Sequence, residues 1–165
     1  MMRRSLPLLL LAACSPEPAP AGSDALPVVP VGSAGGRTTP LEAEAAAAPE
    51  LAQMDAADLR QKNMLGAGCL FHDAGARTAL LAVRYEGDAL ARTGNRFVRL
   101  AAATPDAAAI SAGTTLAGDG MAITVERGGG TGTPVSRASR DWPATLLLRT
   151  AAGAQRSYAG RWECA

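Results

Sequence analysis

Residues 118–126 have the sequence GDGMAITVE, which contains the clearest strand pattern of the chain. A Gly-Asp-Gly turn comes first. Large apolar residues then occupy every second position, at Met121, Ile123 and Val125, and smaller or polar residues stand between them. A period of two predicts a β-strand with one face in a hydrophobic core.

Similar short runs lie on both sides of this strand. Glycine-containing turns at residues 73–77 and 151–155 separate some of them, as in antiparallel hairpins. The predicted strands include residues 69–71, 81–85, 96–101, 144–150 and 157–164. Six or so strands at hairpin spacing predict an all-β domain over residues 67–165, built as a small antiparallel β-sandwich or barrel.

The N-terminus has the pattern of an export signal. Two arginines at positions 3 and 4 precede a short apolar run that is too short to span a bilayer. The run ends in Leu11-Ala12-Ala13-Cys14, which resembles the lipobox of bacterial lipoproteins. An ordinary secretory signal and a twin-arginine signal are the alternatives.

The resemblance implies that residues 1–13 are a signal peptide and that Cys14 carries lipid. In a Gram-negative host it implies three acyl chains, which give a stable membrane anchor. Ser15 follows the cysteine, and by similarity to the sorting rule of enteric lipoproteins it implies the periplasmic face of the outer membrane.

Cys69 and Cys164 remain once Cys14 is assigned to lipid. An even pair of cysteines in an exported protein predicts a disulfide. This bond would close nearly the whole β-domain into one loop.

Two segments connect the predicted anchor to the β-domain. Residues 14–40 are rich in Pro, Ala, Gly and Ser, which predicts a disordered linker. Residues 41–66 are predicted as a helical stalk, in which Pro49 restarts a helix that continues to about Leu65. The apolar stripe of this helix is thin, so it would dock weakly on the domain or stand free.

The charge balance does not favour polyanion binding. The formal net charge is +1, and aromatic residues make up only 4% of the chain. Residues 14–66 carry a net charge of −4 and residues 67–165 a net charge of +3. The sequence therefore predicts no nucleic-acid partner.

His72, next to Asp73, is the one histidine available for catalysis. A hydrolase would need a serine brought near it, and the candidates are Ser111, Ser136, Ser139 and Ser157. None of them stands in a Gly-x-Ser-x-Gly pattern, so a histidine at the edge of a turn is favoured. One histidine and two bonded cysteines are also too few ligands for zinc, and we expect no metal or cofactor.

Two further motifs favour structural interpretations. Residues 128–133 (GGGTGT) lack the Lys-Ser or Lys-Thr of a phosphate-binding loop, which favours a flexible hairpin loop. Asp119 and Asp141 could form a carboxylate pair, but turn residues are the simpler interpretation.

Arg137, Arg140 and Trp142 follow the glycine-rich loop. Cations, an aromatic side chain and a mobile segment coincide only here, so we expect this to be the binding surface. The favoured alternative for Trp142 is that it covers the end of the sheet.

The lipobox, the linker, the small β-domain and the closing Tyr158-Ala-Gly-Arg-Trp-Glu-Cys164 resemble the membrane-bound inhibitors of C-type lysozyme. This resemblance implies a lipid-anchored β-barrel stapled by a disulfide. The Ser-Gly-x-x-Tyr-like segment that makes inhibitory contacts in that family is missing here. The leading hypothesis is therefore a non-catalytic envelope lipoprotein that binds a periplasmic protein or glycan, with lysozyme inhibition as the alternative.

Overall fold

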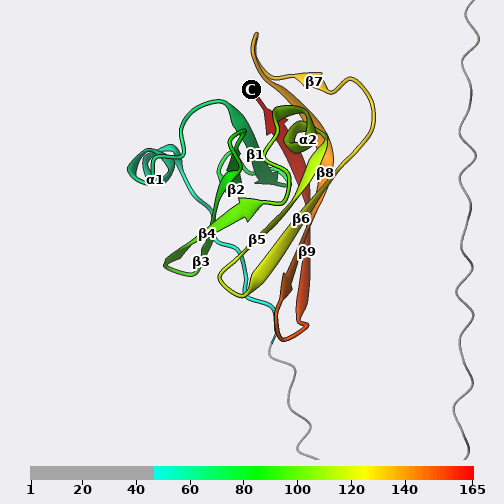
Figure 1. Cartoon of the computed structure of the whole chain (residues 1–165). Helices are drawn as coiled ribbons and strands as arrows, with labels where there is room; N and C mark the ends of the chain where they lie inside the picture. The colour runs from blue at the N-terminus through cyan, green and yellow to red at the C-terminus, as the bar shows by residue number, and fades with distance from the viewer. Residues whose placement is uncertain (1–46) are drawn as a thin grey trace, which may run out of the picture. The chain divides into compact units, whose positions relative to one another are not determined.

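The computed structural model describes residues 47–165 (Figure 1). The predicted signal peptide, the lipidation site Cys14, the linker 14–40 and the start of the stalk lie outside these residues. The elements are α1 (Ala56–Gln61), β1 (Gly68–Asp73), β2 (Ala79–Arg84), β3 (Asp88–Thr93), β4 (Arg96–Ala102), α2 (Ala107–Ala112), β5 (Gly113–Gly118), β6 (Met121–Arg127), β7 (Thr133–Pro134), β8 (Arg140–Thr150) and β9 (Gln155–Cys164). Neither described helix has the length and apolar character needed to traverse a membrane.

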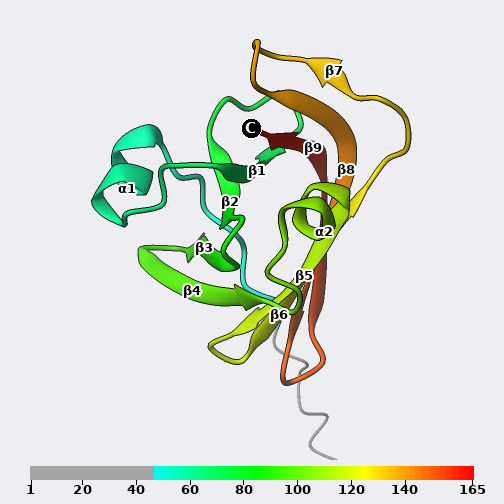
Figure 2. The same ribbon diagram turned by 45° about the horizontal axis from the view of Figure 1, so that its top comes forward.

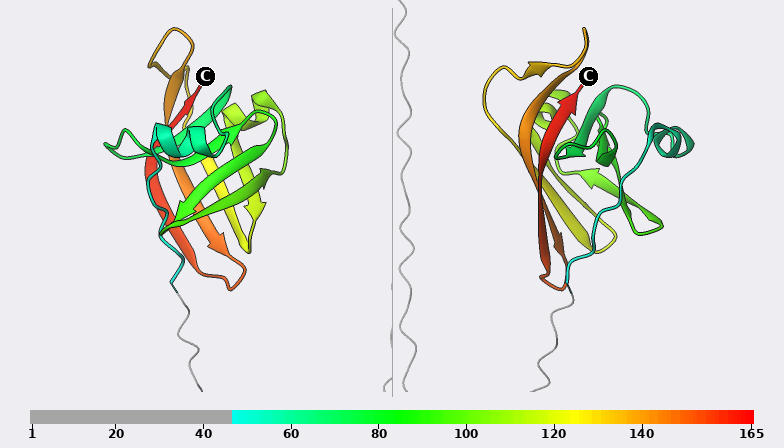
Figure 3. Two further views of the ribbon diagram at one scale, coloured as in Figure 1. Left: turned by 90° about the vertical axis from the view of Figure 1, so that its left-hand side faces the viewer. Right: turned by 180° about the vertical axis from the view of Figure 1, so that it is seen from behind.

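Eight antiparallel strands form a closed barrel (Figures 2 and 3). Their order is β1-β2-β3-β4-β5-β6-β8-β9, and β9 pairs back with β1. The two-residue strand β7 pairs only with the start of β8. The prediction of an all-β antiparallel domain is confirmed, and between the two architectures the structure selects the barrel.

The barrel interior is filled by side chains that follow the predicted period of two. Met121, Ile123 and Val125 of β6 are buried, while the residues between them are more exposed. Helix α2 closes one end, where Ile110 is fully buried and its carbonyl accepts a hydrogen bond of 3.1 Å from Nε1 of Trp162. The interior is therefore a packed core.

The predicted helix from Pro49 to Leu65 is wrong in extent. Helix α1 begins only after Asp55, whose carboxylate accepts hydrogen bonds from the backbone N–H groups of Ala57 and Asp58, as in a capping box. It ends at Gln61; just beyond the C-cap Lys62, Asn63 has φ +58°, and the N–H of Met64 donates to the carbonyl of Leu59. This is the geometry of a left-handed helix C-cap.

Residues 47–66 form a strap along the outside of the barrel, and they are not a stalk. Before α1 the strap is extended, with bridges from Leu51 to Thr93 and from Met54 to Ala79. Met54, Leu59 and Met64 are buried in a second small core with Ala82 and Leu90 of the barrel wall. The compact domain therefore begins before residue 67.

Tyr158 fixes the start of the strap. Its hydroxyl accepts a hydrogen bond of 2.7 Å from the N–H of Leu51, and Nε of Arg156 donates to the carbonyl of Ala48 at 3.2 Å. Burial raises the pKa of Tyr158, and the bond from Leu51 offsets only part of this effect. The folded protein thus holds the phenolic proton more tightly than the unfolded chain does.

We expect the stability of the protein to fall as the pH rises above about 10, the ordinary pKa of tyrosine. Above that pH the unfolded chain loses its proton while folded Tyr158 keeps it, so unfolding becomes more favourable until the folded pKa is passed. The free energy of unfolding, measured by urea titration from about pH 8 to about pH 11, should fall more steeply for the wild type than for Tyr158→Phe. If the free energy of unfolding fell equally with pH in both proteins, the loss of stability would not come from Tyr158.

Candidate binding site at the mouth of the barrel

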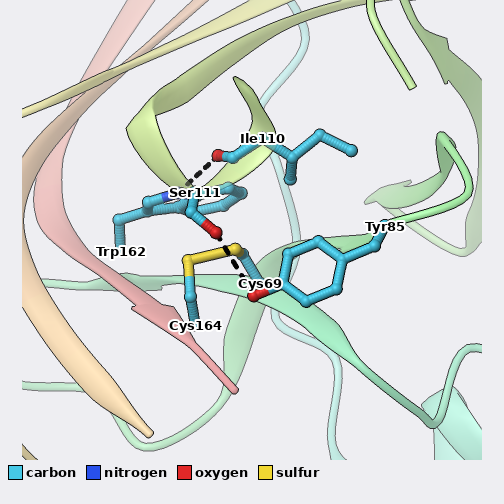
Figure 4. Close-up of a disulfide and its surroundings, with 6 residues drawn as sticks. All are labelled: Cys69, Tyr85, Ile110, Ser111, Trp162 and Cys164. Atoms are coloured by element: carbon cyan, nitrogen blue, oxygen red, sulfur yellow. Dashed lines mark hydrogen bonds between the residues drawn. A yellow bond between two sulfur atoms is a disulfide. The ribbon is translucent and has the colours of Figure 1, made fainter. Parts of the chain in front are cut away.

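The disulfide lies at the end of the barrel closed by α2, which we call the mouth. Cys69 of β1 and Cys164 of β9 stand opposite each other in the strand register and are bonded, 95 residues apart in sequence. Beside the disulfide, the hydroxyl of Ser111 donates to the hydroxyl of Tyr85 at 3.2 Å (Figure 4). The predicted disulfide is confirmed.

Trp142 anchors the glycine-rich loop and is not an exposed contact residue. It is only 9% exposed, and its Nε1 donates to the carbonyl of Gly130 at 3.1 Å. The guanidinium of Arg127 lies 4.5 Å from the ring centroid. The expectation that Trp142 is exposed for binding is wrong, because its side chain is buried in the core and bonded to the loop.

Gly132 packs against the ring of Trp142. Its φ is +72°, and a Cβ atom placed on it would lie 2.5 Å from the ring atom Cε2. In the same loop, a Cβ on Gly129 would meet nothing within 4 Å. The two glycines therefore offer a matched pair of substitutions.

We expect Gly132→Ala to destabilise the protein by about 1 to 3 kcal/mol, because it combines a strained backbone with overpacking against Trp142. Gly129→Ala should stay within about 0.5 kcal/mol of the wild type. Urea unfolding followed by tryptophan fluorescence measures the free energy of unfolding of both variants. Equal stability of the two variants would show that the loop does not depend on this contact.

Both predicted arginines are exposed at the mouth. Nη1 of Arg140 donates to the carbonyls of Thr131 at 3.0 Å and Gly132 at 3.3 Å, so it holds the loop. Within the described part of the chain, the guanidinium of Arg137 has no hydrogen-bond or ion-pair partner. Arg137 is thus available for a ligand.

A pocket of about 260 Å³ brings these arginines together with hydroxyl groups. Trp142 also contributes to its wall. The polar side chains that line the pocket are Tyr85, Ser111, Ser136, Arg137, Ser139 and Arg140. No Asp or Glu side chain of the described residues lines it. Ser136 and Ser139 form a tight turn in which their Oγ atoms lie 2.9 Å apart.

The sequence does not indicate that Tyr85 and Ser111 belong to the binding pocket. Tyr85 follows β2, and Ser111 belongs to α2, which was not expected at all. They reach the mouth only because the barrel closes and α2 folds over its end. No local pattern around either residue indicates this position.

The structure does not assemble a catalytic pair around His72. This side chain is buried on the outer wall of β1, where Nδ1 lies 3.3 Å from the carbonyl oxygen of Thr78. Nε2 lies 3.4 Å from a carboxylate oxygen of Glu163 but makes no hydrogen bond to the described residues. None of the four candidate serines, all in the described part, hydrogen-bonds to His72.

The structure does not bring Asp119 and Asp141 together as a carboxylate pair. Asp119 pairs with Arg96 at 2.9 Å, and Asp141 pairs with Arg161 at 2.7 Å. The two aspartates lie near opposite ends of β8. Asp119 is close to Met121, which pairs with Thr150 at the end of the strand, while Asp141 is near its start.

Residues 128–132 connect β6 to β7, so the strand-to-helix context of a phosphate loop is missing. Among residues 47–165, no cluster of three or more metal-ligating side chains occurs.

Comparisons with protein-family models, curated proteins and solved structures found no match to this chain. The pocket is therefore the basis for assigning a function. Within residues 47–165, it offers Arg137 without a partner, Arg140 with spare donors, and four hydroxyl groups.

Proposed function

We propose that this protein is a non-catalytic lipoprotein of the bacterial envelope that binds a component of the envelope at the mouth of its barrel. In this proposal the acyl chains on Cys14 hold it to the periplasmic face of the outer membrane. The lipobox residues and Ser15 support the location. The barrel supports the role of a rigid scaffold, because its interior is filled and its strands close on themselves.

The observation that carries the proposal is the convergence of Arg137 and Arg140 with hydroxyl groups in one pocket. A concave site with a few converging polar groups on a rigid scaffold is the usual form of a binding site. Arginine is also enriched at binding hot spots, and Arg137 has no described partner to occupy it.

The test is chemical crosslinking of the full-length protein in whole envelopes, followed by capture under denaturing conditions. We expect specific adducts with the wild type and at least ~10-fold less adduct with Arg137→Gln, the loss expected for one charge-assisted hydrogen bond. Arg149→Gln is the matched control, because Arg149 is exposed on the same strand as Arg140 but near the opposite end. Equal capture by both variants would exclude the mouth as the binding site.

The proposed anchor has its own test. Mass spectrometry of the mature protein should find Cys14 as an acylated first residue. Cys14→Ser should move the protein from the membrane fraction to the soluble fraction, because the lipid supplies the membrane affinity. An unmodified Cys14 in the mature protein would refute the lipoprotein proposal and leave the pocket unaffected.

A second candidate function is lysozyme inhibition. It is favoured by one observation, a closed barrel stapled by a disulfide, which is the fold that the resemblance to the membrane-bound lysozyme inhibitors implies. The full-length protein should then slow a C-type lysozyme at about equimolar amounts, as expected for tight binding. No slowing at a large excess would remove this candidate.

A further inference from the structure

We infer that the mouth pocket binds a sugar unit that carries a carboxylate group, as in an acidic glycan. This inference rests on the proposed function, since it names the ligand class of the same site. It follows from the charge, the hydroxyl pattern and the size of the pocket.

The two charged side chains that line the pocket, Arg137 and Arg140, are both cationic and favour an anion. Arg137 has no partner among the described residues, and Arg140 uses only Nη1 to hold the loop. The nearest acidic residue in sequence, Asp141, is paired with Arg161. Guanidinium groups bind carboxylates through two parallel hydrogen bonds, which makes a carboxylate the natural ligand group here.

The remaining polar groups suit a sugar. Hydroxyl groups both donate and accept hydrogen bonds, so the pairs Ser111–Tyr85 and Ser136–Ser139 can each turn toward a ligand hydroxyl. Tyr85 adds aromatic surface to the wall of the pocket, whereas the ring of Trp142 is already packed against Arg127 and Gly132. An aromatic ring offers an apolar face to the C–H side of a sugar and keeps a polar tip for its hydroxyls.

The size of the pocket argues for a small unit rather than a protein surface. Its volume of about 260 Å³ lies just below the range of roughly 300 to 1,000 Å³ that is typical of pockets for drug-sized ligands. A stable protein partner would instead need an interface of roughly 800 Å² on each side. A single acidic sugar at the end or side of a glycan fits the pocket better.

Isothermal titration calorimetry of the full-length protein in a sugar-free detergent tests the inference. The acidic probes are N-acetylmuramic acid, a cell-wall sugar, and glucuronic acid, a sugar of acidic capsules. Their neutral counterparts are N-acetylglucosamine and glucose, and acetate is a carboxylate without a sugar. We expect at least one acidic sugar to bind ~10-fold or more tightly than its neutral counterpart and than acetate. The probe that binds identifies the source of the glycan.

Arg137→Gln should weaken the binding of that acidic sugar by ~10-fold or more, and Arg149→Gln should leave it unchanged. Equal binding of acidic and neutral sugars, equal binding of acetate, or no binding of any sugar would overturn the inference. If no sugar binds while the envelope adducts still depend on Arg137, the ligand class is wrong and the proposed function stands. If the adducts are also independent of Arg137, both fail.

Discussion

Replacement of both Cys69 and Cys164 by serine is expected to lower the free energy of unfolding by about 4 to 5 kcal/mol, the chain-entropy value for a loop of about a hundred residues. The bond closes a loop whose ends are 95 residues apart, which includes all eight strands of the barrel. Without it, the unfolded chain gains conformational freedom, and no covalent bond joins β1 to β9. Small domains have total stabilities of roughly 5 to 15 kcal/mol, so this loss would leave the protein close to unfolding.

Urea unfolding at neutral pH measures this effect. The wild type reduced with dithiothreitol is the control, because it loses the same bond without a change of sequence. Its stability should agree with that of the double variant. A loss below about 1 kcal/mol in both samples would mean that the barrel closes without help from the disulfide.

Trp162→Ala is expected to lower the free energy of unfolding by about 3 to 5 kcal/mol, the range for truncation of a large buried aromatic residue. Trp162 is fully buried, stands opposite Phe71 of β1 and Trp142 of β8, and donates to the carbonyl of Ile110 in α2. Its removal leaves a cavity and an unsatisfied carbonyl where α2 closes the mouth.

Two further variants separate the contributions at Trp162. Trp162→Phe keeps most of the apolar volume and loses the hydrogen bond, so it should cost about 1 to 3 kcal/mol. Arg149→Ala, at an exposed position, should change the stability by less than about 0.5 kcal/mol. If Trp162→Ala lowered the free energy of unfolding as little as Arg149→Ala, Trp162 would not be packed in the core as described.

The fold class could be predicted from the strands with large apolar residues. In β6 the alternation of Met121, Ile123 and Val125 is visible because smaller or polar residues occupy the outer face. In β3, Ala89, Leu90 and Ala91 are all buried because the interior covers one face and the strap the other. A strand buried on both faces has no period of two, and β3 was therefore missed.

The strap could not be predicted because its conformation depends on the barrel. Residues such as Leu51 and Met54 have helical spacing in a segment with good helix formers, which favoured a long helix. The N–H of Ala52 instead donates to the carbonyl of Arg92 in β3, and Met54 exchanges two backbone hydrogen bonds with Ala79 of β2. Tertiary contacts thus override local propensity here.

Half of the binding pocket could be predicted and half could not. Arg137 and Arg140 lie close together in sequence, so a local pattern was enough to find them. Tyr85 and Ser111 are distant in sequence and meet the arginines only through barrel closure. The Trp142 side chain can pack against the loop only because residue 132 is glycine, which leaves room for the ring.

The most direct test of the central claim is site-specific photocrosslinking in intact cells. A photoreactive amino acid replaces Ala138, which is exposed in the mouth pocket, or Ala152, which is exposed in the turn after β8 at the opposite end of the barrel. We expect a discrete adduct from position 138 that is absent from position 152 and is lost when Arg137 is replaced by glutamine. The same adduct from both positions, or none from position 138, would contradict the claim that this protein binds its ligand at the mouth of the barrel.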